Sequence, residues 1–460
     1  MLITFRVANF LSFNAEEEFS MLAGKVRKPV RPAVTIGTGV DVLKMAVVYG
    51  ANASGKSNLV RSIDFAKKVI VNGVKNVVSF EDHFRLEKGN YNQPTKFEFE
   101  FKLGDKCYAY GYVLQLNTKI IIEEWLYELK KTTQKPIFER TIDSSGISVF
   151  KSKPTLSGEN ETRFSIYTED LQNHELLLST LGNKQWPDKS YFLTFTSILK
   201  WFKQSLIVFY TDTKINPYAF IESTMPGLTG KEFMSEMLQQ LGTGIDAIEL
   251  IAEDAEQIIN ELPHDQRQRI IDRITKGENP YLVRGRKRYI FSKEPKKGEI
   301  IVSRVITKHG AKGGVSDEQF DYEDESDGTK RLFDFIPLLR VLTVPGNPVT
   351  VILDEIDRSL HPELLHKLIA YYLSFSKDSS SQLIVTTHES SLLDLSLLRR
   401  DEVWFVEKNK QGESHLYSLE EFQPRFDKEI RKAYLQGRYG AIPFISDVQQ
   451  LNWETANAEG

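Results

Sequence analysis

The chain contains almost no cysteine, no long hydrophobic run and no excess of positive charge. Cys107 is the only cysteine among 460 residues, which excludes an intrachain disulfide and a zinc site built from several thiolates. No apolar run approaches the ~20 residues needed to cross a bilayer. The N-terminal stretch MLITFRVANFLSF is interrupted by Arg6 and Asn9 and lacks the apolar core of a signal peptide. We therefore expect a cytoplasmic protein without a membrane partner.

The charge balance argues against a chain that coats nucleic acid over its whole surface. The 59 Lys and Arg residues are opposed by 63 Asp and Glu residues, which gives a formal net charge of −4. Any contact with DNA must therefore be regional. Hydrophobic residues make up 41% of the chain and charged residues 27%, as in an ordinary globular protein. The length is sufficient for two or three packed lobes.

Three zones of the chain differ in their patterns. Residues 1–195 are rich in strand patterns, and KFEFEFKLGDKCYAYGYVLQL predicts a hairpin that turns at Gly104 and Asp105. Residues 196–310 show helical periodicity followed by a basic stretch, so we expect an insert or lid there and not a sheet core. Residues 311–460 alternate strands and helices again. The pattern predicts an α/β fold in two lobes separated by the insert.

The segment VVYGANASGKSNLVRSI carries the strongest chemical signal. It matches the pattern G-x-x-x-x-G-K-[ST] of a phosphate-binding P-loop, between an apolar run and a segment with apolar residues at helical spacing. This context argues against a glycine-rich turn with a surface lysine. We expect Lys56 to reach the β and γ phosphates of a nucleotide and Ser57 to bind Mg²⁺. The predicted nucleotide-binding residues of the motif are Gly50, Asn52, Gly55, Lys56 and Ser57.

A pair of carboxylates follows the apolar run Val349–Leu353 in VTVILDEIDRSLHPEL. Such a run is typical of a parallel strand buried on both faces, and open α/β sheets bind ligands at the edge where it ends. Asp354 is a predicted Mg²⁺ ligand, and Glu355 is a predicted general base that polarises the attacking water. A lone Asp-Glu pair is usually a strand end that meets solvent, but its combination with a P-loop favours the functional interpretation.

A third apolar strand, in LIVTTHES, ends at Thr387 and His388. An isolated histidine after a strand is more often a surface residue than a functional one. As the third element after Lys56 and Glu355, however, it has the position of a γ-phosphate sensor. We therefore predict Glu355 and His388 as the catalytic residues.

Together, these three motifs resemble those of the ABC, SMC and RecF class of ATPases. FRVANFLSF is similar to the opening strand of RecF- and SMC-like heads, and GANASGKSNL carries their asparagine after the P-loop, here Asn58. DEIDRSLHP, VTTHESSLLD, RRDEVWFVEK and YLQGRYGAIP are similar to stand-alone ATPases of bacterial defence loci, of the OLD, Septu, PARIS and abortive-infection types. Among these, the resemblance points to the ATPase subunit of PARIS-type anti-phage systems. It implies a RecF-type head with a central parallel sheet, an antiparallel N-terminal sheet portion and a helical, basic insert.

The resemblance also gives a role to the acidic stretch YEDESDGTKRL. In that class a serine-glycine signature lies just upstream of the strand that ends in the carboxylates, and Ser326 and Gly328 take this position here. The implied role is a helix N-terminus that closes over the γ-phosphate of an ATP bound to a second subunit. A plain helix cap at Ser326 is the alternative, and the two roles can coexist. The sequence departs from the class at the D-loop aspartate, where His361 stands, and Gln93 and Gln115 are only candidates for the Q-loop glutamine.

The function implied by the resemblance is Mg²⁺-dependent ATP hydrolysis between subunits of a homo-oligomer, a dimer or larger. The protein would be a sensor or scaffold of an anti-phage defence system that responds to a phage trigger protein. We expect its effector, a nuclease or toxin, to be a separate chain, because the stretch after Glu402 is too short for an attached nuclease domain.

Two alternatives stay open from the sequence. One is a RecF- or SMC-like repair ATPase that clamps DNA through a basic stretch with interleaved Tyr289 and Phe291, although such runs are more often solvated hairpins. The other is the nucleotide-binding subunit of a transporter, against which the absence of an L-S-G-G-Q signature speaks. The cations of the basic stretch are Arg284, Arg286, Lys287, Arg288, Lys293, Lys296 and Lys297.

Overall fold

The computed structural model divides into two compact units. Unit 1 comprises Met1–Thr211, Pro345–Ile356 and Ser379–Gly460, and unit 2 comprises Asp212–Val344 and Asp357–Asp378. The three zones predicted along the chain stay a prediction, because the units are defined by contacts and each draws on separate stretches of sequence. The structure describes residues 1–26, 31–36, 39–77, 81–143, 145–211, 213, 221, 229–294, 298–310, 317–346, 348–424 and 430–442. Lys296, Lys297 and Pro443 of the stretches discussed above lie outside the described residues.

Unit 1 contains a seven-stranded antiparallel sheet with the order β10-β9-β8-β7-β6-β1-β2. The predicted hairpin is confirmed, since Leu103 pairs with Lys106 across the turn at Gly104, which has a φ of +59°. Alternation in KFEFEF buries Phe97, Phe99 and Phe101 on one face of the sheet. The strands are β1 (Leu2–Ala8), β2 (Glu17–Ser20), β6 (Thr95–Leu103), β7 (Lys106–Gln115), β8 (Ile120–Leu129), β9 (Gln134–Ile142) and β10 (Ser148–Ser152).

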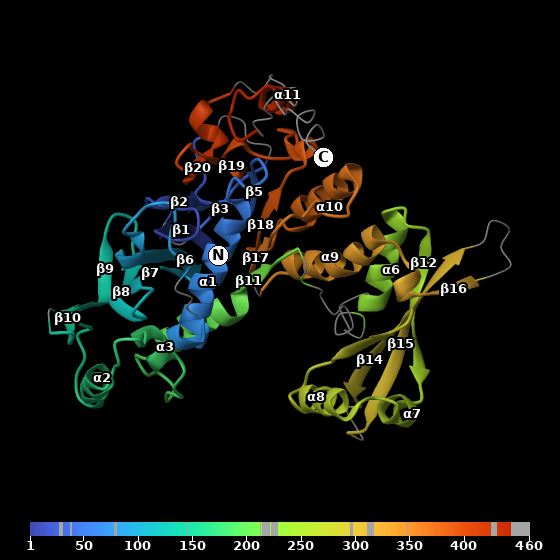
Figure 1. The fold of residues 1–460 in the computed structure, drawn as a ribbon, viewed down its shortest axis with the longest axis horizontal. Coiled ribbons are helices and arrows are strands. Elements are labelled where there is room, and N and C mark those ends of the chain that lie inside the picture. The colour runs from blue at the N-terminus through green and yellow to red at the C-terminus, as the bar shows by residue number, and fades with distance from the viewer. Residues whose placement is uncertain are drawn as a thin grey trace, which may run out of the picture. The chain divides into compact units, whose positions relative to one another are not determined.

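The second sheet of unit 1 is mostly parallel and has the order β11-β17-β18-β5-β19-β20, with only β20 antiparallel to its neighbour. Figure 1 shows β19, β5, β18, β17 and β11 side by side. Every residue of β5, β17 and β18 is buried, as the continuous apolar runs predict. The strands are β5 (Met45–Tyr49), β11 (Leu206–Phe209), β17 (Thr350–Leu353), β18 (Gln382–Thr387), β19 (Val403–Lys408) and β20 (Ser414–Ser418), and the small hairpin β3 (Val34–Thr35) and β4 (Asp41–Val42) forms a separate sheet.

Helix α1 (Lys56–Asn72) belongs to the core that the two sheets share. Gly73 caps its C-terminal end, and its Phe65 ring lies 5.6 Å from that of Phe97 in the antiparallel sheet. The same hydrophobic cluster contains Ile352 and Ile384 of the parallel sheet. The P-loop is therefore anchored to the hydrophobic core of the unit. The other helices of unit 1 are α2 (Glu159–Glu169), α3 (Leu177–Gly182), α4 (Leu193–Lys200) and α11 (Ile430–Leu435).

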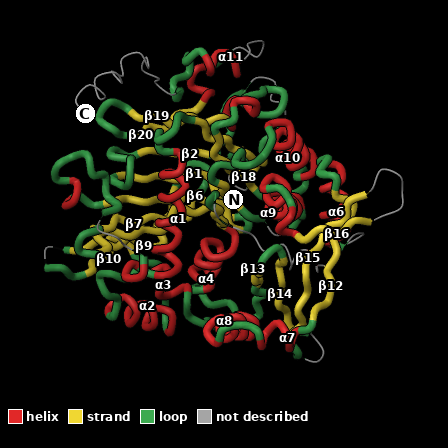
Figure 2. The backbone as a smooth tube through the Cα atoms, turned by 45° about the vertical axis from the view of Figure 1, so that its right-hand side comes forward, coloured by secondary structure: helices red, strands yellow, loops and turns green. Residues whose placement is uncertain are grey.

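Unit 2 combines helices with an antiparallel sheet of order β12-β15-β14-β13, to which β16 adds by pairing with β15 (Figure 2). Ile258 of α7, Ile270 and Ile274 of α8, and Leu262 between the two helices pack on Phe291 and its neighbours in the sheet. The helical periodicity of the insert is confirmed in α6, α7 and α8, whereas the basic stretch forms strands. The elements are α6 (Gly230–Gln240), β12 (Ile245–Glu253), α7 (Ala255–Asn260), α8 (His264–Thr275), β13 (Tyr281–Arg284), β14 (Lys287–Lys293), β15 (Ile300–Gly310), β16 (Asp317–Asp321), α9 (Asp327–Thr343) and α10 (Pro362–Phe375).

The basic stretch differs from the expectation of an insert without a sheet core for a physical reason. Its uncharged residues Tyr289, Ile290 and Phe291 are all buried, because β14 lies inside the sheet between β13 and β15. In the sequence, the flanking Lys and Arg residues made this short apolar run difficult to recognise as a buried strand. Within the described part of the chain, no helix is both long and apolar enough to span a membrane.

Candidate nucleotide site

The P-loop connects the central strand β5 to α1. Lys56 opens the helix and is 4% exposed. Its Nζ donates to the backbone carbonyls of Gly50 and Ala51 at 2.9 and 3.0 Å. The ammonium group thus lies folded across its own loop, where its partners include neutral carbonyls that bind a cation more weakly than a phosphate does.

Two P-loop glycines occupy positions that a larger residue does not fit. Gly55 has a φ of +118°, and a Cβ there would lie 2.3 Å from Ser414 Oγ. A Cβ on Gly50 would lie 2.5 Å from both Ser54 Oγ and the Val406 carbonyl oxygen. Ser54 Oγ is buried and has no hydrogen-bond partner among the described residues. The loop is therefore a tight cradle with one unsatisfied hydroxyl, which fits a phosphate group.

Ser57 and Asp354 meet at the edge of the parallel sheet. Ser57 Oγ donates to Asp354 Oδ1 at 3.1 Å, and Thr386 Oγ1 on β18 donates to the same oxygen at 2.7 Å. Asp354 is 5% exposed. In the described ranges, no three His, Cys, Asp or Glu side chains are grouped to hold a metal ion. A hydroxyl and one carboxylate nevertheless fit Mg²⁺, because this ion keeps several of its waters.

Glu355 has an unusual backbone conformation. Its φ of +50° lies in the left-handed region, which few residues other than glycine adopt. Its N–H donates to Thr386 Oγ1 at 2.8 Å, and Thr211 Oγ1 donates to its Oε2 at 3.4 Å. The half-buried carboxylate is thus oriented by residues of the two neighbouring strand ends. Thr211 and Thr386 were missed by sequence reasoning, since a polar residue at a strand end was the only signal.

His388 is exposed directly after β18, and its Nδ1 lies 3.3 Å from Lys56 Nζ. Parallel pairing of Thr387 with Tyr49 brings the ends of β18 and β5 to the same sheet edge. Five predicted residues from three strand ends therefore lie together in unit 1. They are Lys56, Ser57, Asp354, Glu355 and His388.

Asn52 and Asn58 differ from these five residues. Asn52 is exposed on the P-loop, whereas the Asn58 amide donates to Ser12 Oγ at 2.8 Å. Ser12 Oγ also lies 2.8 Å from Ser414 Oγ, and Ser414 Oγ donates to the carbonyl of Ser54 at 2.6 Å. Asn58 therefore connects the start of α1 to the loop after β1 and to the hairpin formed by β19 and β20, here called the β20 hairpin.

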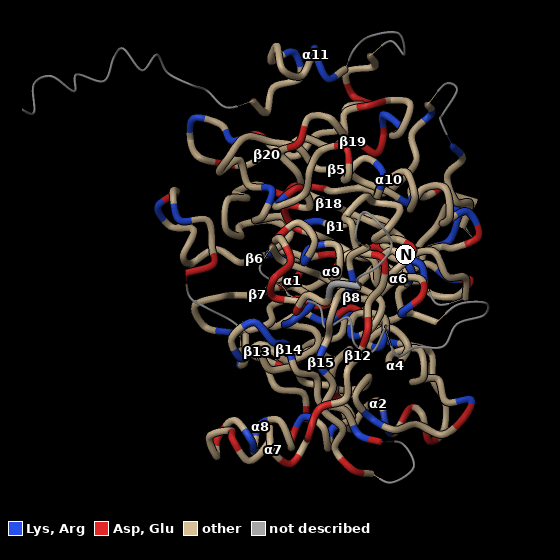
Figure 3. The backbone as a smooth tube through the Cα atoms, turned by 90° about the vertical axis from the view of Figure 1, so that its right-hand side faces the viewer, with Lys and Arg blue, Asp and Glu red and all other residues tan. Residues whose placement is uncertain are grey.

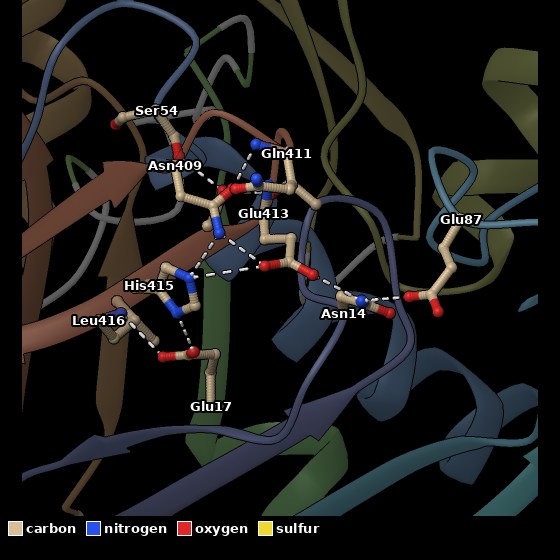
Figure 4. A network of polar contacts seen from close by, with 11 residues as sticks. Asn14, Glu17, Ser54, Glu87, Asn409, Gln411, Glu413, His415 and Leu416 are labelled. Atoms are coloured by element: carbon tan, nitrogen blue, oxygen red, sulfur yellow. Dashed lines mark hydrogen bonds and ion pairs between the residues drawn. The ribbon is translucent and has the colours of Figure 1, made fainter.

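The β20 hairpin is held by a network of polar contacts that lies next to Ser54 of the P-loop (Figure 4). Glu413 accepts a hydrogen bond from the Asn14 amide at 2.6 Å, and His415 Nδ1 lies 2.8 Å from Glu17 Oε1. Both neighbours of Ser414 are thus attached to the stretch from Asn14 to the first residue of β2. The contact between Ser414 and the P-loop is consequently supported from both sides.

Ser326 and Gly328 belong to unit 2, at the start of α9. Ser326 is the N-cap, and its Oγ accepts from the Thr329 N–H at 3.1 Å. The helix-cap alternative is thus confirmed, and it leaves the signature role as a prediction. A Cβ on Gly328 would lie 2.8 Å from the Ser359 carbonyl oxygen, so the first turn of α9 lies close to the segment before α10. His361 is the N-cap of α10, and its Nδ1 accepts a hydrogen bond from the Glu363 N–H.

The acidic stretch before α9 pairs with the basic stretch. Arg288 is 3% exposed, lies 3.1 Å from Glu323 Oε1 and places its guanidinium 3.8 Å from the centre of the Tyr322 ring. Arg286 lies 3.3 Å from Asp324. In Figure 3, basic residues (blue) and acidic residues (red) accordingly lie close together around β13, β14 and β15. Further pairs in this sheet are Arg284 with Glu261, and Arg304 with Glu253 and Asp321.

The chain matches one protein family over residues 45–184 and 211–394, which together exceed half of its length. The family is described as "AAA domain, putative AbiEii toxin, Type IV TA system". The chain belongs to this family. It is thereby a P-loop ATPase of the AAA class, and ATP with Mg²⁺ is the cofactor pair of such families. Among curated proteins, none matches the chain.

Several solved structures are weakly similar to this chain over most of its length. The SMC head domain from Thermotoga maritima is 12% identical with a TM-score of 0.33, covering 91% of this chain and 98% of that one. The Smc head domain with an extended coiled coil bound to the C-terminal domain of ScpA, derived from Pyrococcus furiosus, is 14% identical with a TM-score of 0.36, covering 95% and 99%. The SmcHead bound to the C-winged helix domain of ScpA is 14% identical with a TM-score of 0.39, covering 91% and 97%. The strand order itself shows an α/β fold with a mostly parallel sheet and a separate antiparallel sheet.

Proposed function

We propose that this protein is a Mg²⁺-dependent ATPase that acts as the sensor or scaffold of an anti-phage defence system. One observation carries the enzymatic part, namely the convergence of the P-loop, the Ser57–Asp354 pair, Glu355 and His388 at one sheet edge. Hydrolysis takes place with ATP held between subunits of a homo-oligomer, to which Ser326 and Gly328 of the second subunit contribute.

Each residue has a distinct task in this proposal. When bound, ATP supplies the γ-phosphoryl group and Mg²⁺ neutralises its developing charge. Lys56 exchanges the carbonyls of Gly50 and Ala51 for phosphate oxygens, and Ser57 and Asp354 hold the metal ion. Glu355 orients a water molecule and accepts its proton. His388, beside Lys56, donates a hydrogen bond to the γ-phosphate.

The first test is ATP binding and turnover by purified protein. Lys56→Ala abolishes binding, because the charged phosphate contact is lost. Glu355→Gln retains binding but lowers the rate of hydrolysis by roughly 10²- to 10⁴-fold, since the general base is removed. Glu389→Gln is the matched control, because that carboxylate accepts from the Ser391 N–H of its own loop. If the Glu355→Gln variant hydrolysed ATP at the wild-type rate, Glu355 would not be the general base.

The defence role is supported by the family description, which names a toxin of a toxin–antitoxin system, and by the resemblance to defence ATPases. It is tested by native-mass analysis of the tagged protein expressed with its neighbouring genes, comparing wild type and Glu355→Gln in ATP. A separately encoded nuclease or toxin that copurifies with the ATPase supports the proposal. An ATP-dependent dimer that retains DNA instead of a protein partner refutes it.

The ion pairs of unit 2 weigh against the DNA-clamp alternative. Arg284, Arg286 and Arg288 of the basic stretch each have a carboxylate partner within their own unit. DNA phosphates would have to displace these carboxylates, which reduces the gain from each contact. Among the described residues of the basic stretch, Lys287 and Lys293 are exposed.

A further inference from the structure

Three consecutive residues after β17 are hydrogen-bonded to a single residue of β18, Thr386. The Thr386 hydroxyl donates to Asp354 Oδ1 at 2.7 Å and accepts from the Glu355 N–H at 2.8 Å. The Thr386 carbonyl accepts from the Ile356 N–H at 3.0 Å. The cause is the register of the parallel sheet, in which Leu353 pairs with Val385. The residues that follow Leu353 therefore run alongside Thr386.

The two bonds of the hydroxyl use its chemistry in a directional way. A threonine hydroxyl has one proton to donate, and here that proton goes to Asp354. Its lone pairs remain for the Glu355 N–H, so both contacts are made at once. A carboxylate acceptor makes the first bond charge-assisted and short, which restricts the rotation of the Asp354 side chain. Thr386 is fully buried, so water does not compete for either contact.

The contact with Glu355 bears on its backbone. A φ of +50° is unfavourable for a residue with a Cβ and persists only where surrounding contacts hold it. The Thr386 hydroxyl supplies such a contact at the residue's own N–H. Loss of the hydroxyl therefore frees the peptide before Glu355 to rotate, and the direction of the Glu355 carboxylate changes with it.

We propose that Thr386 is a positioning residue for ATP hydrolysis, which sets Asp354 for metal binding and Glu355 for activation of water. The inference rests on the proposed function, because it concerns the same site. Thr386 touches neither the reacting atoms nor any nucleotide in this proposal. It acts through its two neighbours, so its removal affects turnover and metal dependence more than ATP binding.

The test compares Thr386→Val with Thr386→Ser. Valine keeps the shape and the β-branched side chain but has no hydroxyl, whereas serine keeps the hydroxyl. Thr350→Val is the matched control. Thr350 lies at the opposite end of β17, is equally buried, and its hydroxyl donates to Gln382 Oε1 at 2.8 Å and accepts from the Leu2 N–H at 3.3 Å. Both valine variants thus lose two hydrogen bonds at one buried hydroxyl in the parallel sheet.

Three quantities are measured for each variant: kcat, KM for ATP, and the Mg²⁺ concentration for half-maximal binding of a fluorescent ATP analogue. In Thr386→Val we expect kcat to fall roughly tenfold to a hundredfold, which corresponds to the loss of a hydrogen bond to a charged group. We expect KM to change less than kcat, and the Mg²⁺ requirement to rise. Thr386→Ser restores most of kcat. Thr350→Val lowers the melting temperature by a similar amount but leaves kcat and the Mg²⁺ requirement unchanged.

Equal kcat and equal Mg²⁺ requirement in Thr386→Val and wild type overturn the inference. So does a kcat loss of the same size in Thr350→Val, because the effect would then be one of stability. Wild-type protein that neither binds nor hydrolyses ATP overturns the proposed function instead. The Mg²⁺ titration of binding keeps the two cases apart even where turnover is slow.

Discussion

The buried carboxyl group of Glu402 predicts that unit 1 loses stability as the pH rises toward 7. Glu402 precedes β19 and is fully buried. Its Oε2 accepts from the Arg399 N–H at 2.9 Å and from the Arg31 guanidinium, whereas Oε1 has no hydrogen-bond partner among the described residues. Burial outweighs the nearby Arg31 charge and raises the pKa of Glu402 from 4.5 to about 7.

The sign of the effect follows from the direction of this shift. The folded protein binds the Glu402 proton more tightly than the unfolded chain, since the folded pKa is the higher one. Its contribution to stability is therefore complete below pH 4.5 and is lost as the pH rises through 7. At about 1.36 kcal/mol per pKa unit, the change between pH 5 and pH 8 is about 2.5 kcal/mol.

The assay is urea denaturation of wild type and Glu402→Gln at pH 5 and pH 8. Trp125, Trp186, Trp201 and Trp404 lie in the described part of unit 1, so their fluorescence follows the unfolding of that unit. Because glutamine does not titrate, the free energy of unfolding of wild type relative to the variant falls by about 2.5 kcal/mol between the two pH values. Other titrating groups cancel in this difference. The exposed Glu169→Gln controls for the removal of one negative charge.

A difference between wild type and Glu402→Gln that is the same at both pH values would refute this reasoning. It would mean that the Arg31 guanidinium keeps Glu402 ionised in the fold, so that the ion pair prevails over burial.

Three further predictions concern the P-loop, the antiparallel sheet and the start of α9. Gly55→Ala lowers ATP affinity at least tenfold in a binding titration, because its Cβ would lie 2.3 Å from Ser414 Oγ. Unchanged affinity would contradict the inference that the P-loop is a tight cradle for phosphate. Arg140→Ala destabilises unit 1 by about 3–5 kcal/mol in urea denaturation, because the fully buried Glu124 then lacks its cation; a loss under 1 kcal/mol would contradict this. Ser326→Ala costs about 1 kcal/mol of stability through the lost helix cap and lowers ATP hydrolysis more than ATP binding. Equal loss of both activities would favour a folding role alone.

Local sequence was sufficient for the hairpin and for the P-loop strand and helix. Each depends on neighbouring residues, such as the alternation in KFEFEF or the glycines around Lys56. The same holds for the expectation that Asp354, Glu355 and His388 end strands at one sheet edge, because parallel strands of this type share the edge at which they bind ligands.

The basic stretch shows where local reasoning failed. Its charges indicated a solvated hairpin or, as the alternative, a surface for nucleic acid, but Arg288 is almost fully buried against Tyr322 and Glu323. That contact depends on how β14 pairs with β15 and on where the chain turns before α9. Charge pattern alone contains neither piece of information.

The sequence by itself determined which residues form the candidate nucleotide site, because a P-loop, a carboxylate pair and a strand-terminal histidine are recognised from residue types at short spacing. Only the tertiary structure decided what supports them. Thr386 contacts Asp354 because β17 and β18 are neighbours in register, and Ser414 contacts Ser12 across 402 positions of sequence because the β20 hairpin reaches the N-terminal loop. Strand order arises from the packing of the whole unit, so no short stretch of sequence encodes these contacts.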